Sequence, residues 1–450
     1  MVTFLLFIIM FSITMWSYKY SKRNFLSLTF LSSAMFTLLS FIYIIFYKYI
    51  GRDLSFRTLV IIVSSQFCSA LGEFIGNKIV FGERNSEDLC RRKKETEFYF
   101  SNICEIYISK KRTFLIFLLT LLIAILRYLK LYQYLISNGI ATNFLSVISD
   151  VRVEYSLGKV RMGGVLAAAY YISLVIGYIY SFLFVQTILK THKKKLYLLL
   201  PVFGYALCVI STTSRSEYIK LAFAFITAFM INYIYNKKKK INFIKFGVWA
   251  CIFSFFFLWY GFVIRGVRNE GISSIIRNIV SYSSASLYGL DEYLKNPWVE
   301  NKYFGQYTLN NIYALLGHET ISGYEPTFFM SNAKSNIYTS LVKPIQDYGI
   351  GGMLISRLIL GLVSAKIQEV FIYKNLKEMS YFLWFIFECH LVYIFLMIPI
   401  GDKAYIFFLY PKYLLELIIS FFISIFLLIR IKYYFYNGEI IQVGTFKRRR

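Results

Sequence analysis

Arginine is the side chain with which this sequence could most readily do chemistry. Its guanidinium presents a planar fork of N–H donors that fits phosphate oxygens, and it stays charged at any physiological pH. Such a group could bind a pyrophosphate, or it could anchor a helix end among lipid headgroups. The arginines that stand between long apolar stretches are Arg152, Arg161, Arg215 (within Thr213-Ser214-Arg215-Ser216), Arg265, Arg268 and Arg277.

Candidates for proton transfer occur in the same parts of the chain. His318 is followed directly by Glu319, and Asp347 precedes an apolar stretch. Histidine titrates nearest to neutral pH, which makes His318 the first candidate for a general base, although a lone histidine in a loop is often incidental. Glu325 and Asp402 are further candidates, and the choice among these groups stays open.

Three ionisable residues lie inside apolar stretches: Glu388, His390 and Glu416. A charge within a membrane is costly, so such residues are functional candidates by default. The alternative is that they pair with each other or with a neighbouring helix.

No signature points to a nucleotide, a metal or another cofactor. The chain lacks a Walker A loop, a dinucleotide fingerprint, a nucleophile elbow and the His/Cys spacing of a metal site. It has only three histidines. We therefore expect no cofactor and no metal, which disfavours an ATP-driven pump or a metalloenzyme.

The elements that must position these residues are membrane-spanning helices. Only 16% of residues are charged and 57% are hydrophobic, whereas an average soluble domain is about a quarter charged. The apolar blocks of roughly 17 to 25 residues suit helices that cross a bilayer, and their unbroken character excludes a barrel. We predict an all-α polytopic integral membrane protein, a single transmembrane domain over residues 1–450. Its spans, about eleven in number, are expected at residues 3–16, 25–47, 58–75, 113–129, 163–189, 196–211, 218–235, 246–263, 348–369, 380–398 and 413–429.

The distribution of Lys and Arg predicts the orientation. When loops are assigned alternately to the two sides, one side receives more than half of the 50 basic residues, including those of the basic loop 77–112. Because basic residues accumulate in cytoplasmic loops, the N-terminus is predicted outside and the C-terminus in the cytoplasm. This topology accounts for the net charge of +26, so we expect no nucleic-acid partner. No cysteine falls in an outer loop, so no disulfide framework is implied.

Two long loops, residues 130–162 and 265–347, face the outside in this topology. The second contains Trp298 and several Tyr and Phe, which argues against disorder, and helix-like runs such as residues 271–280. We expect it to fold as short helices over the bundle. A chain that places its extramembrane mass outside is expected to work there.

Four features resemble the O-antigen and capsular polysaccharide polymerases (Wzy-type oligosaccharide repeat unit polymerases). One is the architecture of many spans with two outer loops, the later one large. The other three are Arg152 with Gly163, similar to the family's Arg-x10-Gly element; the Ser-Arg-Ser turn at Arg215; and Asn336-Ile337-Tyr338-Thr339 with Asp347-Tyr348-Gly349-Ile350-Gly351-Gly352, similar to Asn-x-Tyr-Thr and Asp-x-Gly-x-x-Gly. The resemblance covers about residues 110–420. The large loop has no second Arg-x10-Gly, which leaves open which of its arginines does the corresponding work.

The resemblance implies a metal-independent glycosyltransferase at the outer face of a bacterial cytoplasmic membrane. Its substrates would be undecaprenyl-pyrophosphate-linked oligosaccharides, with a chain-length regulator and a flippase as possible partners. An acceptor hydroxyl would attack the donor's anomeric carbon, and fixed cations would stabilise the departing pyrophosphate.

The resemblance also implies roles for individual residues. The cations at the pyrophosphate would be Arg152, Arg215 and Arg265, then Arg161 and Arg268. The base, or the group that orients the acceptor, would be His318, Asp347 or Glu319. Residues that bind substrate or shape the site would be Gly163, Asn336, Tyr338, Gly349 and Gly352.

Two other functions remain open from the sequence. A lipid-linked oligosaccharide flippase or transporter would use the arginines to line a path, and it predicts charged residues deep in several spans with modest outer loops. An O-antigen ligase would use the same arginines to transfer a finished glycan.

Overall fold

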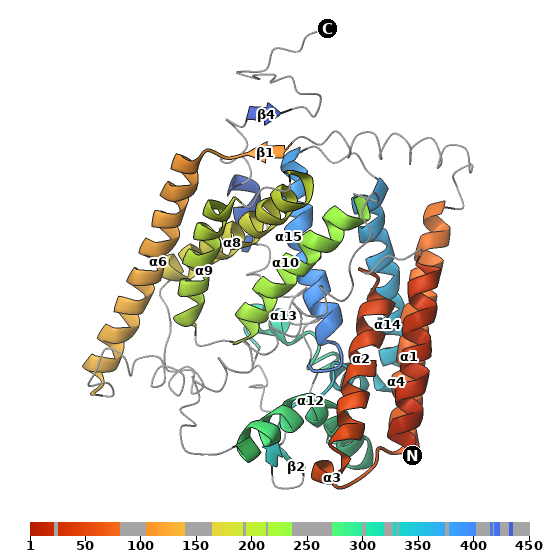
Figure 1. The fold of residues 1–450 in the computed structure, drawn as a ribbon. Coiled ribbons are helices and arrows are strands. Elements are labelled where there is room, and N and C mark those ends of the chain that lie inside the picture. Colours follow the sequence, from red (N-terminus) through yellow and green to blue (C-terminus); the bar gives the residue numbers. More distant parts are fainter. Residues whose placement is uncertain are drawn as a thin grey trace. The chain divides into compact units, whose positions relative to one another are not determined.

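The structure is a computed structural model that describes residues 1–21, 26–81, 105–139, 164–191, 195–212, 215–235, 272–298, 303–318, 327–330, 333–373, 378–401, 415–416, 418–423 and 432–434. These residues are mostly helical, and the strands among them have three residues each (Figure 1). The chain forms two compact units, which are described separately. Unit 1 comprises Met1–Arg92, Glu270–Lys374 and Leu391–Tyr413, and unit 2 comprises Lys93–Asn269, Asn375–His390 and Leu414–Arg450.

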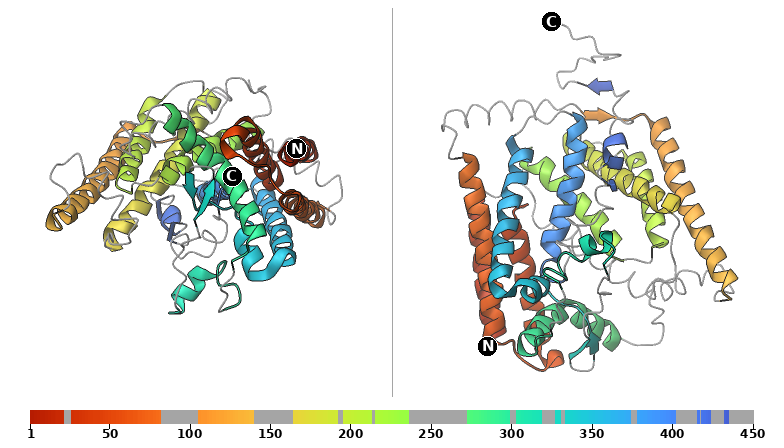
Figure 2. Two further views of the ribbon diagram at one scale, coloured as in Figure 1. Left: turned by 90° about the horizontal axis from the view of Figure 1, so that it is seen from below. Right: turned by 180° about the vertical axis from the view of Figure 1, so that it is seen from behind.

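Unit 1 is built on long helices from both ends of its sequence. They are α1 (Val2–Tyr20), α2 (Leu28–Ile45), α4 (Phe56–Phe81) and α14 (Val342–Tyr373). The remaining elements are α3 (Tyr47–Ile50), α12 (Ile272–Lys295), α13 (Asn310–Leu315) and the antiparallel pair β2 (Phe328–Met330) and β3 (Ala333–Ser335). In the side views α12 lies across the ends of the long helices (Figures 1 and 2).

Glycines allow α4 and α14 to pack closely. A Cβ atom on Gly72 of α4 would lie 2.1 Å from the Leu358 carbonyl oxygen, and one on Gly361 of α14 would lie 2.2 Å from that of Ser69. Small residues at such crossings let helix backbones approach closely. This matters in a membrane because the hydrophobic effect does not drive helices together there, and close packing does. The two helices, far apart in sequence, therefore form one tightly packed pair.

Unit 2 contains α6 (Lys110–Ser137), α8 (Gly164–Thr191), α9 (Leu200–Ile210) preceded by the 3-10 turn η1 (Leu196–Leu199), and α10 (Arg215–Tyr235). The helix α15 (Glu378–Met397) belongs to unit 2 as far as residue His390, and its remaining residues belong to unit 1. A short antiparallel pair, β1 (Glu105–Tyr107) and β4 (Lys432–Tyr434), joins two distant segments. Gly204 of α9 faces Thr120 of α6, where a Cβ atom would lie 2.0 Å from the threonine hydroxyl.

The structure supports the prediction of a helical membrane protein. Among the described residues, six helices are long and apolar enough to cross a bilayer: α1, α2, α4, α6, α8 and α14. Residues Leu196–Ile210 and Phe382–Met397 form shorter apolar helices. The expected span 246–263 lies outside the described residues, and 413–429 is described only in part. The count of about eleven spans therefore stays a prediction, as does the orientation of the termini.

Several predicted loop boundaries differ from those observed. The helix α6 continues to Ser137, eight residues into the expected loop 130–162, most of which is not described. In the expected loop 265–347, α12 is a 24-residue helix rather than a short one, and α14 already begins at Val342. At the expected loop 77–112, α4 reaches Phe81 and α6 begins at Lys110.

Candidate functional site

A buried arginine is the centre of the candidate site in unit 2. Arg127 lies on α6 with only 4% of its surface exposed. Its Nε donates to Ser211 Oγ at 2.8 Å, its Nη1 donates to the Leu166 carbonyl at 2.9 Å, and its guanidinium lies 4.8 Å from the centre of the Tyr170 ring. Among the described residues, no carboxylate pairs with it. A buried cation without a counter-charge is costly, so this position suits an anionic ligand.

A carboxylate adjoins Arg127 through Tyr170. The Tyr170 hydroxyl donates to Glu217 Oε2 at 2.9 Å, and the Tyr205 hydroxyl donates to the same oxygen at 3.4 Å. Lys220 donates from Nζ to Glu217 Oε1 at 2.8 Å. Because Lys220 neutralises Glu217, no carboxylate of the described residues is left to balance the charge of Arg127. The tyrosines fix the carboxylate in place with respect to the arginine.

This network connects two elements that the sequence analysis singled out. Leu166, which accepts a hydrogen bond from Arg127, is three residues beyond Gly163. Ser211, the other partner, is four residues before Arg215, the first residue of α10. The beginning of α8 and the turn between α9 and α10 therefore meet at Arg127.

The site lies toward one end of α6. Arg127 follows Lys110 by 17 residues, which corresponds to about 26 Å along a helix. In the predicted topology this is the outer part of the span. In that topology the arginine is expected near the level of the outer lipid headgroups.

Unit 2 also buries an ionisable pair. His390 Nε2 of α15 lies 2.9 Å from Glu416 Oε2, and both residues are buried. The His390 ring lies 5.6 Å from that of Tyr178 on α8. The carboxyl group of Glu388 is also buried, with no hydrogen-bond partner among the described residues. Pairing, the simpler of the two expectations from sequence, therefore applies to His390 and Glu416.

In unit 1, Asp347 holds a turn. Its two carboxylate oxygens accept the backbone N–H groups of Tyr307 at 3.0 Å and Thr308 at 2.7 Å. The adjacent Tyr348 hydroxyl lies 2.7 Å from Thr308 Oγ1. A carboxylate engaged in this way orders the loop before α13, which is a structural alternative to its expected role as a base.

The other proton-transfer candidate, His318, is exposed after α13. Its ring lies 5.5 Å from that of Tyr303 and 5.8 Å from that of Tyr313. The structure does not describe Glu319, Glu325 or Asp402. No acid–base pair with His318 is formed by the described residues.

The residues of the Asn-x-Tyr-Thr element have different surroundings. Asn336 is exposed, whereas Tyr338 is buried, with its ring 5.2 Å from Phe328 and 6.0 Å from Trp298. Tyr338 therefore packs in the core of the region that follows α12, and Asn336 is the member accessible to a ligand.

The glycines that follow Asp347 have a structural role, because the backbone there needs a positive φ at one position and close packing at another. Gly349 has φ +70° and ψ −175° within α14, a conformation that residues with a Cβ rarely adopt, and it interrupts the helix. A Cβ atom on Gly352 would lie 2.1 Å from that of Tyr348. Both positions require glycine to shape the start of α14.

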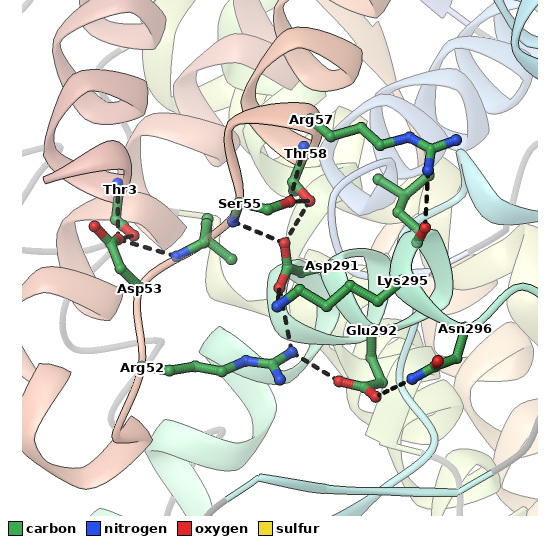
Figure 3. Close-up of polar contacts among 12 residues, drawn as sticks. Thr3, Arg52, Asp53, Ser55, Arg57, Thr58, Asp291, Glu292, Lys295 and Asn296 are labelled. Atoms are coloured by element: carbon green, nitrogen blue, oxygen red, sulfur yellow. Dashed lines mark hydrogen bonds and ion pairs between the residues drawn. The ribbon is translucent and has the colours of Figure 1, made fainter.

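A charged cluster fastens α12 to the N-terminal end of α4 (Figure 3). The fully buried Asp291 accepts from Ser55 N at 2.8 Å and Thr58 Oγ1 at 2.7 Å, and it pairs with Arg52 at 3.2 Å and Lys295 at 2.8 Å. Burial opposes ionisation of Asp291, but its hydrogen bonds from Lys295, Ser55 and Thr58 outweigh this and place its pKa below the usual value. With its charges balanced, we take this cluster as a structural clamp.

The remaining predicted cations lie beyond what the structure describes. These are Arg152, Arg161, Arg265 and Arg268, together with the side chains of Arg215 and Arg277; Gly163 is also outside the described residues. Sequence reasoning missed Arg127, Glu217 and Lys220. The available signal was a charged residue within or beside an apolar stretch, as at Arg127 within the expected span 113–129.

Comparisons with protein-family models, with curated proteins and with solved structures find no match for the chain.

Proposed function

We propose that the protein joins undecaprenyl-pyrophosphate-linked oligosaccharide repeat units into O-antigen or capsular polysaccharide at the outer face of a bacterial cytoplasmic membrane. The observation that carries this proposal is the buried Arg127, which lies between the beginning of α8 and the turn before α10 and pairs with no carboxylate in the part of the chain that the structure describes. Each of these places adjoins an arginine-bearing element that resembles the polymerases, at Gly163 and at Arg215.

The chemistry follows from where the charge develops. The acceptor hydroxyl attacks the anomeric carbon of the donor while the bond from that carbon to the pyrophosphate oxygen breaks. The electron pair leaves on the pyrophosphate, and the hydroxyl proton passes to a base. Fixed cations in a poorly solvated position lower the barrier because they are already oriented toward the departing oxygen. Arg127 would add to Arg152, Arg215 and Arg265 in this role, with Arg161 and Arg268 next.

A polymerisation assay with purified protein in lipid vesicles tests the proposal. The protein receives undecaprenyl-pyrophosphate repeat unit with chelator and without nucleotide sugar, and the product is a ladder of lengthening glycan. We expect Arg127→Gln to slow the reaction about 100-fold, as loss of one preoriented donor does, and Arg152→Ala and Arg215→Ala to do likewise. Arg112→Gln, at the other end of α6, is the matched control and should retain the ladder.

A flippase for the same lipid-linked oligosaccharide is the second candidate. It is favoured by ionisable side chains along the helices of unit 2, such as the buried Glu388 and His390 and the partly buried Glu217. If folded protein yields no ladder but moves the lipid substrate across the vesicle bilayer, the flippase replaces the polymerase. An O-antigen ligase would instead transfer preformed glycan to a different acceptor without lengthening it.

A further inference from the structure

The segment 303–318 of unit 1 is unusually apolar for a loop in water. Residues 303–317 contain no Asp, Glu, Lys or Arg, although the chain as a whole is 16% charged. Large side chains of this segment are nevertheless exposed in the described structure: Phe304 by 76%, Leu315 by 66% and Leu316 by 68%. Contiguous exposed apolar side chains mark a surface that contacts a protein, a ligand or a membrane.

The segment is fixed to the beginning of an apolar helix. Asp347 binds the N–H groups of Tyr307 and Thr308, and the rings of Phe304 and Tyr348 lie 4.9 Å apart. The stretch Val342–Gln368 of α14 is long and apolar enough to cross a bilayer. In the side views α13 lies at a level between the two ends of the long helices of unit 1, whereas α12 lies across one end of these helices (Figures 1 and 2).

The exposed surface of α14 continues this apolar character. Ile355 and Ile359, four residues apart on one helix face, are 61% and 53% exposed. In a spanning helix such a face contacts lipid. The segment 303–318 is therefore continuous with a surface that already requires lipid as its partner.

Many backbone N–H groups of the segment are bonded within the protein, as contact with lipid requires. A polar backbone group without a partner is costly there, so donors must be satisfied within the protein. Leu309 N–H donates to the Gly305 carbonyl at 2.7 Å, and Leu316 N–H donates to that of Ile312 at 3.0 Å. His318 N–H likewise donates to a carbonyl, that of Tyr313, at 3.0 Å.

We propose that residues 303–318 form a membrane-contacting surface whose apolar side chains lie at the boundary between headgroups and acyl chains of the bilayer. The leucines of α13 and its following turn, with Phe304, face the acyl chains. The mutually contacting rings of Tyr303, Tyr313 and His318 lie at the headgroups, where amphipathic aromatic side chains are enriched. This inference does not depend on the proposed polymerase activity.

Photolabelling of the unmodified protein in vesicles tests the proposal. The vesicles contain phosphatidylethanolamine, phosphatidylglycerol and a phospholipid with a diazirine near the ester end of its acyl chain. Mass spectrometry after illumination should find label in residues 303–317. The nearby residues 295–297, exposed at the end of α12, serve as the internal control and should stay unlabelled.

A complementary experiment uses hydroxyl radicals generated in water. They should modify residues 295–297 and spare Leu315 and Leu316. The double variant L315Q/L316Q should reduce lipid labelling of the segment several-fold while leaving the melting temperature unchanged. Strong modification of the two leucines from water, with no label from the lipid, would overturn the proposal. So would lipid labelling that the double variant does not reduce.

Discussion

Removal of the Asp291 carboxylate should detach α12 from unit 1. In Asp291→Ala the part-buried N–H group of Ser55 and the buried hydroxyl of Thr58 lose this acceptor, and Arg52 and Lys295 lose a counter-charge. Asp291 is fully buried, so water cannot replace it without opening the contact.

The expected loss can be worked out from these contacts. Each buried polar group left without a partner costs about 1–3 kcal/mol. Removing one partner of a buried ion pair costs about 3–5 kcal/mol. The cost of the unpaired polar groups and the cost of the broken ion pair describe partly the same loss, so they are not added in full. The partners Arg52 and Lys295 are 32% and 44% exposed and therefore regain some hydration. We expect unit 1 to lose about 3–4 kcal/mol in Asp291→Ala and about half of that in Asp291→Asn, which keeps an acceptor oxygen.

Hydrogen exchange in lipid nanodiscs is the suitable measurement, because it reports the opening of α12 separately from the rest of unit 1. The amides of the described part of α12 should exchange several hundred-fold faster in Asp291→Ala, the factor that corresponds to about 3–4 kcal/mol. Thermal unfolding in detergent supplies an independent value.

The matched control is Glu292→Gln. Glu292 also pairs with Arg52, at 2.8 Å, but its side chain is 29% exposed. A pair of this kind contributes at most about 1 kcal/mol. Equal effects of Asp291→Ala and Glu292→Gln on α12 exchange would refute the reasoning from burial.

Three further predictions follow from the same structure. Because the pKa of Asp291 lies below its usual value, its stabilisation is complete above the ordinary aspartate pKa of about 3.9 and is lost as pH falls through the lower folded value; melting temperatures measured against pH should show this loss in the wild type and not in Asp291→Asn. Gly361→Ala should destabilise unit 1 by about 1–3 kcal/mol, since its Cβ would meet a backbone carbonyl, whereas Gly351→Ala on the same helix meets no atom within 4 Å and should be neutral by thermal unfolding. Tyr170→Phe removes a hydrogen bond to Glu217 at 2.9 Å that contributes about 1.5–3 kcal/mol, and it should slow polymerisation; an unchanged rate would show that the position of Glu217 does not matter to the reaction.

The helices could largely be placed from hydropathy. The expected span 163–189 corresponds to α8, Gly164–Thr191, and 58–75 lies within α4, Phe56–Phe81. Long apolar runs report directly how much chain can be buried in lipid. Where helices continue as amphipathic sequence, as α6 does to Ser137 and α12 does over 24 residues, average hydropathy carries no such signal.

The candidate site was harder to predict because the role of each of its residues depends on tertiary contacts. The sequence marks Asp347 as an ionisable residue beside a span, but its partners lie about 40 residues earlier in the chain. It also shows Arg127 as a single charge in an apolar run. Only the packing of α6 with α8 and α9 shows that this charge is buried and lacks a carboxylate among the described residues.

The close pairing of α4 with α14 has a consequence for biosynthesis. Gly72 packs against the backbone of Leu358, and the ribosome adds Leu358 about 290 residues after Gly72. At roughly 5–20 residues per second, the glycine face of α4 remains without α14 for about 15 seconds to a minute. During that interval other small-residue helix faces compete for it. Assembly of unit 1 is therefore a late event in translation, exposed to any insertion factor or protease that recognises an unpaired helix in the membrane.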